Sequence, residues 1–110
     1  VADAVDAADR ARLLNPLALG PLQARALAAD AAGDRVAAIA WYEKATELQP
    51  ENPDTWYDLG LYQAIATHDQ CAAYAAFNHS YTLDPASSRW FPGGPFDVAK
   101  DAVNDGACER

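Results

Sequence analysis

The chain has 110 residues, of which 51% are hydrophobic and 22% charged, and its formal net charge is −8. This length fits one folded unit, and this composition is that of a globular rather than a disordered chain. The acidic balance argues against nucleic acid and anionic membrane surfaces as partners, and no stretch reaches the roughly 20 apolar residues needed for direct membrane insertion of this segment.

Proline recurs along the chain at a regular interval. Pro16, Pro50 and Pro85 each follow a leucine by two positions. Pro16 and Pro50 are 34 positions apart and Pro50 and Pro85 are 35 apart, which indicates a 34-residue repeat with one inserted residue. Between these prolines apolar residues recur three or four positions apart, and no run alternates as a strand would. The sequence therefore predicts two helices in each period.

The first full period holds two predicted helices joined at a glycine. Gly20 and Pro21 suit the start of the first helix, and Gly33 breaks it. Asp34 can then cap the second helix, which ends at Pro50.

The second period repeats this plan. Asn52 can cap a helix that has Pro53 at its first position, and the chain turns between Thr67 and Asp69. A further helix is expected from Gln70 to Leu83. The inserted residue lies between Gly60 and Ala73, a stretch that includes the turn around His68.

Past Pro85 the pattern changes, because a third repeat would place two prolines inside its first helix. We expect residues 86–94 to be irregular, with Trp90 and Phe91 packed onto the last repeat, and a capping helix from about Pro95 to Asp105. The residues expected on the apolar edge of this helix are Val98, Ala99, Ala102 and Val103. The residues expected to face water are Asp97, Lys100, Asp101 and Asp105.

Large and small residues stand at fixed places in the two periods. Trp56, Leu59 and Gly60 follow a large-large-small order, and with them the chain resembles the tetratricopeptide repeat (TPR) family, whose unit is a helix-turn-helix. Other residues that fit the family's pattern are Ala73, Phe77, Ser80 and Pro85 in the second period and Gly33, Asp34, Ala38, Tyr42, Ala45 and Pro50 in the first. In the first helix Leu22, Arg25 and Ala26 replace the usual tryptophan, leucine and glycine, so that helix is a degenerate copy.

The resemblance implies an all-α fold. It would be a TPR-like, right-handed superhelical solenoid of antiparallel helix hairpins, with about 2.5 repeats and a C-terminal capping helix. We expect a single domain with four parts: residues 1–18 as the second half of a truncated repeat, 19–52 as a repeat, 53–86 as a repeat with the insertion, and 87–110 as an irregular linker and the capping helix.

The resemblance also implies roles for individual residues. The expected structural core residues are Tyr42, Trp56, Leu59, Gly60 and Phe77. Ligands of the family usually lie along the concave face of the first helices, and the residues at those positions are Gln23, Leu27, Asp30, Tyr57, Leu61 and Ile65. The alternative for Tyr57 and Leu61 is that the amino-terminal half-repeat or the cap packs against them.

The two cysteines are too few, and too badly spaced, for a zinc site. If the capping helix runs antiparallel to the helix over 70–83, its end lies level with the beginning of that helix, and Cys108 approaches Cys71. The sequence leaves open a disulfide and two unpaired thiols. A disulfide would indicate an oxidising compartment, on the extracytoplasmic side of a bacterial membrane, whereas unpaired cysteines would suit the cytoplasm.

The sequence predicts no catalytic site, metal site or cofactor. His68 and His79 have no paired thiol or serine arrangement around them, which favours surface or capping roles. Asp3, Asp6 and Asp9 form an acidic helix face rather than a calcium loop, because they lack the glycine that turns such a loop.

Three functions compete. The first is a protein-interaction module that binds a protein or peptide. The second starts from Leu14–Leu17 and Asn52–Gly60, which look like the TPR tails of some bacterial O-antigen ligase-like membrane proteins; there the domain would position or recruit, without catalysing. The third is a structural self-association module that forms a homodimer.

Overall fold

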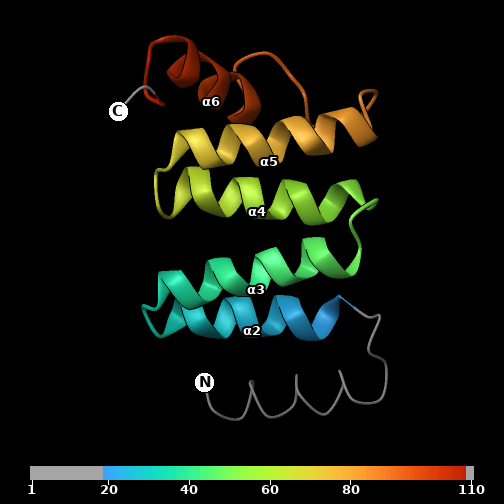
Figure 1. Cartoon of the computed structure of the whole chain (residues 1–110), viewed down its shortest axis with the longest axis vertical. Coiled ribbons are helices and arrows are strands. Elements are labelled where there is room, and N and C mark those ends of the chain that lie inside the picture. Colours follow the sequence, from blue (N-terminus) through green and yellow to red (C-terminus); the bar gives the residue numbers. More distant parts are fainter. Residues whose placement is uncertain (1–18, 109–110) are drawn as a thin grey trace. The chain divides into compact units, whose positions relative to one another are not determined.

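The computed structural model describes residues 19–108, and every regular element in that range is an α-helix (Figure 1). The helices follow one another as hairpins, so the predicted all-α, helix-hairpin fold class is confirmed. The chain divides into two compact units, residues 1–50 and residues 51–110. The half-repeat expected over residues 1–18 lies outside the described residues.

The first unit contains one helix hairpin, formed by α2 (Gly20–Ala31) and α3 (Arg35–Leu48). Gly33 has a φ of +79°, a conformation that glycine adopts readily, and it ends α2 as predicted. The Asp34 side chain then accepts a hydrogen bond of 3.0 Å from the Ala37 amide and caps α3. The core of this hairpin is formed by the buried side chains of Leu22, Ala26, Ala38 and Ala45.

The second unit begins with the hairpin of α4 (Pro53–Ile65) and α5 (Gln70–Leu83). Asn52 caps α4 by accepting a hydrogen bond of 2.9 Å from the Asp54 amide. Asp69 caps α5 in the same way, at 3.1 Å from the Ala72 amide. Between the helices lies His68, the only non-glycine residue with a positive φ, +58°, in the part of the chain that the structure describes. Residues 66–69 separate α4 from α5, one residue more than residues 32–34 between α2 and α3, so the inserted residue lies in this turn and both helices stay regular.

The core of this hairpin depends on a close approach at Gly60. A Cβ atom on Gly60 would lie 2.7 Å from the ring of Phe77, which is completely buried. The buried Ser80 hydroxyl donates a hydrogen bond of 2.8 Å to the Pro53 carbonyl and joins α5 to the start of α4. Gly60 and Ser80, two of the residues that fit the repeat pattern, thus lie at contacts between the two helices.

The capping helix α6 (Pro95–Asn104) packs against α5 (Figure 1). Two predictions about the capping segment are wrong, because Phe91, before α6, is 54% exposed and Val98, within it, is 51% exposed. Instead, Phe96 and the fully buried Ala99, one turn apart, face the core. The physical reason is that a short helix can present only one narrow face to α5, and the bulky Phe96 ring fills the space there.

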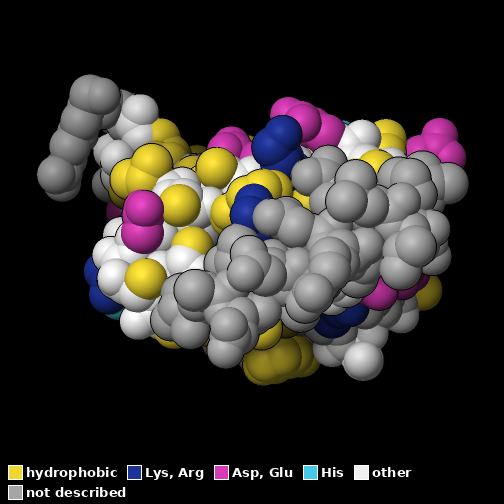
Figure 2. Space-filling model, turned by 90° about the horizontal axis from the view of Figure 1, so that it is seen from below, with side chains coloured by type: hydrophobic (Ala, Val, Ile, Leu, Met, Phe, Trp, Pro, Cys, Tyr) yellow, Lys and Arg dark blue, Asp and Glu magenta, His cyan; other side chains and the backbone are white. Residues whose placement is uncertain are grey.

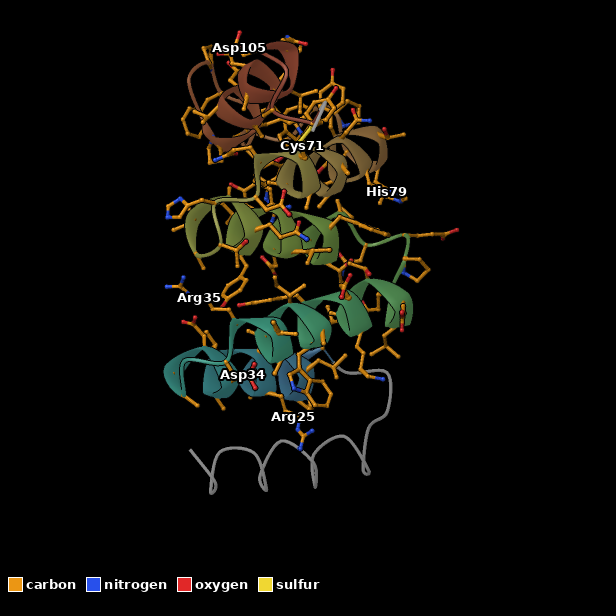
Figure 3. The ribbon with its side chains drawn as sticks, turned by 60° about the vertical axis from the view of Figure 1, so that its left-hand side comes forward. Arg25, Asp34, Arg35, Cys71, His79 and Asp105 are labelled. Atoms are coloured by element: carbon orange, nitrogen blue, oxygen red, sulfur yellow. A yellow bond between two sulfur atoms is a disulfide. The ribbon has the colours of Figure 1, made fainter. Side chains whose placement is uncertain are left out.

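A disulfide joins the cap to α5. Cys71 lies in the first turn of α5 and Cys108 follows α6, with their Cα atoms 5.6 Å apart (Figure 3). The end of the capping segment therefore lies beside the beginning of α5.

Candidate partner-binding face

The six residues assigned to a binding face come from two helices in different units. In α2, Leu27 is 63% exposed, Asp30 is exposed and Gln23 is half-buried. In α4, Ile65 is 66% exposed. Of the apolar residues in this set, Leu27 and Ile65 are therefore the two that are exposed to solvent.

Tyr57 and Leu61 of α4 have partners within their own unit. Both are half-buried and pack against a core cluster of Ala73, Phe77 and Ala99. Trp90, in the segment before α6, also packs edge-on against Tyr57, with 5.7 Å between the ring centroids. Tyr57 therefore contacts the capping segment, and a partner-binding role for Tyr57 and Leu61 stays a prediction.

The other core positions differ in how deeply they lie. Leu59, Gly60 and Phe77 are buried, whereas Tyr42 and Trp56 are only half-buried. The Trp56 ring stacks on His79, with 3.8 Å between the ring centroids. His79 is thus engaged in packing against an aromatic ring.

Six aromatic residues of the second unit form what we call the aromatic cluster. Its members are Tyr57, Tyr74, Phe77, Tyr81, Trp90 and Phe96. Phe96 is central, because its ring lies 5.1 Å from that of Trp90, 5.8 Å from Tyr74 and 5.7 Å from Tyr81. These contacts join α4, α5 and α6 to the segment between α5 and α6.

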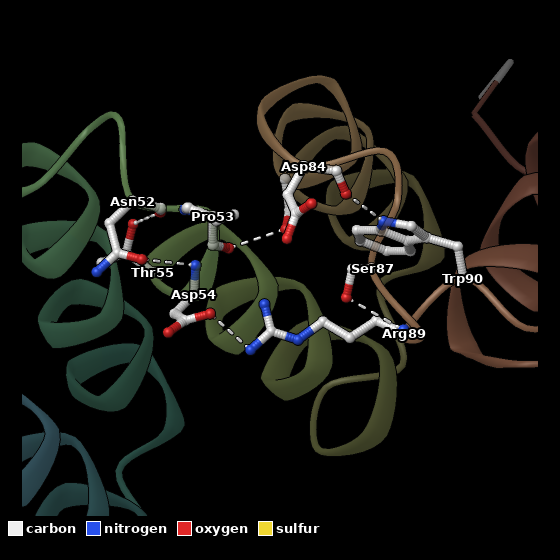
Figure 4. Close-up of polar contacts among 9 residues, drawn as sticks. Asn52, Pro53, Asp54, Thr55, Asp84, Ser87, Arg89 and Trp90 are labelled. Carbon is white, nitrogen blue, oxygen red and sulfur yellow. Dashed lines mark hydrogen bonds and ion pairs between the residues drawn. The ribbon is translucent and has the colours of Figure 1, made fainter.

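Arg89, in the segment between α5 and α6, makes two contacts with α4, of which Figure 4 shows the ion pair with Asp54. Its Nη2 atom lies 2.6 Å from Oδ1 of Asp54, and its guanidinium carbon lies 4.4 Å from the centroid of the Tyr57 ring. The neighbouring Trp90 is held separately, because its Nε1 donates a hydrogen bond of 2.8 Å to the Asp84 carbonyl. The start of α4 therefore carries a carboxylate and a ring that together hold a guanidinium group.

The first unit contains a second guanidinium–ring contact. The guanidinium carbon of Arg25 lies 4.2 Å from the centroid of the Trp41 ring. Arg25 stands where the repeat pattern has leucine, and the contact explains how the position tolerates a charge: the flat guanidinium covers an aromatic face.

Charge is distributed unevenly between the units. Residues 51–108 include eight acidic residues but only two basic ones, Arg89 and Lys100. Residues 19–50 include four acidic and three basic residues. In the view from below, the lysine and arginine side chains of described residues lie among hydrophobic and acidic ones (Figure 2). The acidic excess therefore belongs mainly to the unit that carries Asp54 and Tyr57.

Two residues of this region, Arg89 and Phe96, were not predicted from the sequence. Phe96 could have been found, because it precedes Ala99 by three positions and so shares its helix face. Arg89 had no such signal, since it is a single arginine in an irregular segment. Among the described residues, no group of three or more histidine, cysteine, aspartate or glutamate side chains could hold a metal ion.

The described residues form paired, packed helices and no strands, which places this chain in the class of helical-repeat proteins. Residues 31–64 match the family model of the TPR repeat, a stretch that covers α3 and nearly all of α4. The match spans roughly a third of the 110 residues and supports a place in the TPR family. No curated protein matches the chain. None of the helices in residues 19–108 has the length and apolar character needed to cross a membrane.

Proposed function

We propose that this chain is a protein-interaction module that binds a peptide or helix of another protein through exposed residues of α2 or of α4, without catalysing a reaction. The observation that carries the proposal is the TPR match over residues 31–64, because repeats of this kind generally bind proteins. Leu27 and Ile65 support it, since each offers an exposed apolar side chain on the first helix of a hairpin.

A peptide array probed with the whole chain tests this proposal. Leu27→Asp and Ile65→Asp should each weaken binding of the selected peptides by about tenfold, because they put a charge where an apolar contact forms. Val36→Asp is the matched control: Val36 is 81% exposed but lies at the start of α3, so binding should persist. An array without signal above background, or equal loss in all three variants, would contradict the proposal.

A second candidate is an extracytoplasmic module, such as the tail of an O-antigen ligase-like envelope protein. The disulfide between Cys71 and Cys108 favours it, because such bonds persist in oxidising compartments. In this role the module would position or recruit a partner for a membrane-embedded enzyme.

Alkylation of the protein from its native host, without reductant, followed by intact-mass measurement tests this candidate. An unmodified cysteine pair is expected, and two alkylated cysteines would contradict it. Gel filtration of the isolated chain tests the third candidate, since a self-association module should elute as a dimer.

A further inference from the structure

We propose that Asp54 and Tyr57 form a recognition site for a guanidinium group, that Arg89 fills it in the free protein, and that the partner supplies an arginine to replace it. This inference rests on the proposed function, because it names the chemistry of the partner at one of the positions assigned to binding. It follows from the geometry at the start of α4.

The site combines the two features that recognise arginine. Asp54 and Tyr57 are three positions apart on α4, so the carboxylate and the ring lie on the same side of the helix. The guanidinium of Arg89 lies over the ring, 4.4 Å from its centroid, while Nη2 pairs with Oδ1 of Asp54 at 2.6 Å. A planar cation suits both contacts at once, whereas the compact ammonium of lysine suits the ring less well.

The Arg89 side chain can leave without loosening the segment that carries it. Trp90 anchors that segment independently, through its hydrogen bond to the Asp84 carbonyl and through its ring contacts with Phe77 and Phe96. The Arg89 amide is held as well, because it donates to the Ser87 hydroxyl at 3.2 Å. Only the rotatable bonds of Arg89 need to change for its guanidinium to move away.

The contacts of Arg89 are also accessible to a competitor. The Asp54 side chain is 58% exposed and that of Arg89 is 30% exposed, so water screens their attraction. The eight acidic residues in 51–108, against Arg89 and Lys100, add a field that attracts a cationic partner. Charge complementarity therefore favours an arginine-bearing peptide as the occupant.

The test measures binding of N-acetyl-argininamide to the whole chain by NMR, from the amide resonances of Asp54 and Tyr57. Arg89→Ala should bind this probe about tenfold more tightly than the unaltered protein, because the internal competitor is gone. Arg89→Gln serves as a second variant that keeps a long polar side chain. Arg35→Ala is the matched control, since Arg35 is exposed on α3 and should not change the affinity.

Two comparisons decide the outcome. Adding Asp54→Asn to Arg89→Ala should remove the gain, and N-acetyl-citrullinamide, which has the same shape without the charge, should bind Arg89→Ala about tenfold more weakly than the arginine probe. Equal affinity in Arg89→Ala, Arg89→Gln and Arg35→Ala would overturn the site, as would equal binding of the two probes. If peptides sensitive to Leu27→Asp still bind after such a result, only this inference fails. If the probe binds as expected but the array finds no peptide, the proposed function fails instead.

Discussion

At the scale of single residues, the packing of the second unit depends on Gly60, which has no side chain. Gly60 lets α4 approach α5 so closely that the Phe77 ring occupies the space of a Cβ atom, 2.7 Å from its ideal position. Phe77 is fully buried and surrounded by the aromatic cluster, so it has little room to shift. The repeat pattern predicted a small residue at this position, and the packing shows why glycine in particular is required.

Gly60→Ala should destabilise the protein by about 1–3 kcal/mol, because the added methyl group overpacks the contact with Phe77. Urea unfolding followed by far-UV circular dichroism measures the loss. Gly20→Ala is the control: it also lies in a helix, but a Cβ atom there meets nothing within 4 Å. Equal midpoints for Gly60→Ala and the unaltered protein would show that Phe77 is not held in place.

At the scale of elements, local signals determine where helices begin. Asp34, Asn52 and Asp69 each cap a helix with a side-chain oxygen, and each contact joins residues two or three positions apart. Such contacts can be predicted from the sequence because they involve only neighbouring residues. The face that α6 buries could not be predicted in this way, since Phe96 and Val98 are both apolar and only contact with α5 distinguishes them.

The turn between α4 and α5 gives a test at this scale. His68 has a φ of +58°, and β-branched residues tolerate that region poorly. His68→Val should therefore lower the free energy of unfolding by about 1 kcal/mol, whereas His68→Gly should leave it unchanged or raise it slightly. Thermal unfolding of the two variants measures the difference. Equal stabilities for the Val and Gly variants would show that the positive φ of His68 does not constrain this position.

At the scale of the whole molecule, the cap depends on contacts distant in sequence. The disulfide joins Cys71 to Cys108 across 37 positions, and the aromatic cluster joins α6 to α4 and α5. The bond restricts the unfolded chain in the second unit, while the ring contacts stabilise the folded one. That both units fold as one domain stays a prediction.

Replacing both cysteines, Cys71→Ser with Cys108→Ser, should lower the free energy of unfolding by about 4 kcal/mol in the loop-entropy account. Urea unfolding of the variant measures this loss. The unaltered protein unfolded with a reductant is the control and should lose a similar amount. Unchanged stability in both experiments would mean that the bond contributes little to holding the cap.

By itself, the sequence determined the repeat, the helix ends and the small residues of the core. These features follow from a 34-residue spacing and from capping and turn preferences that act over a few positions. Only the tertiary structure decided that α6 turns Phe96 and Ala99 toward the core, that Trp90 packs against Tyr57, and that Arg89 lies over Tyr57. Those contacts join segments far apart in the chain, and no local preference specifies which side chains will meet when the helices pack.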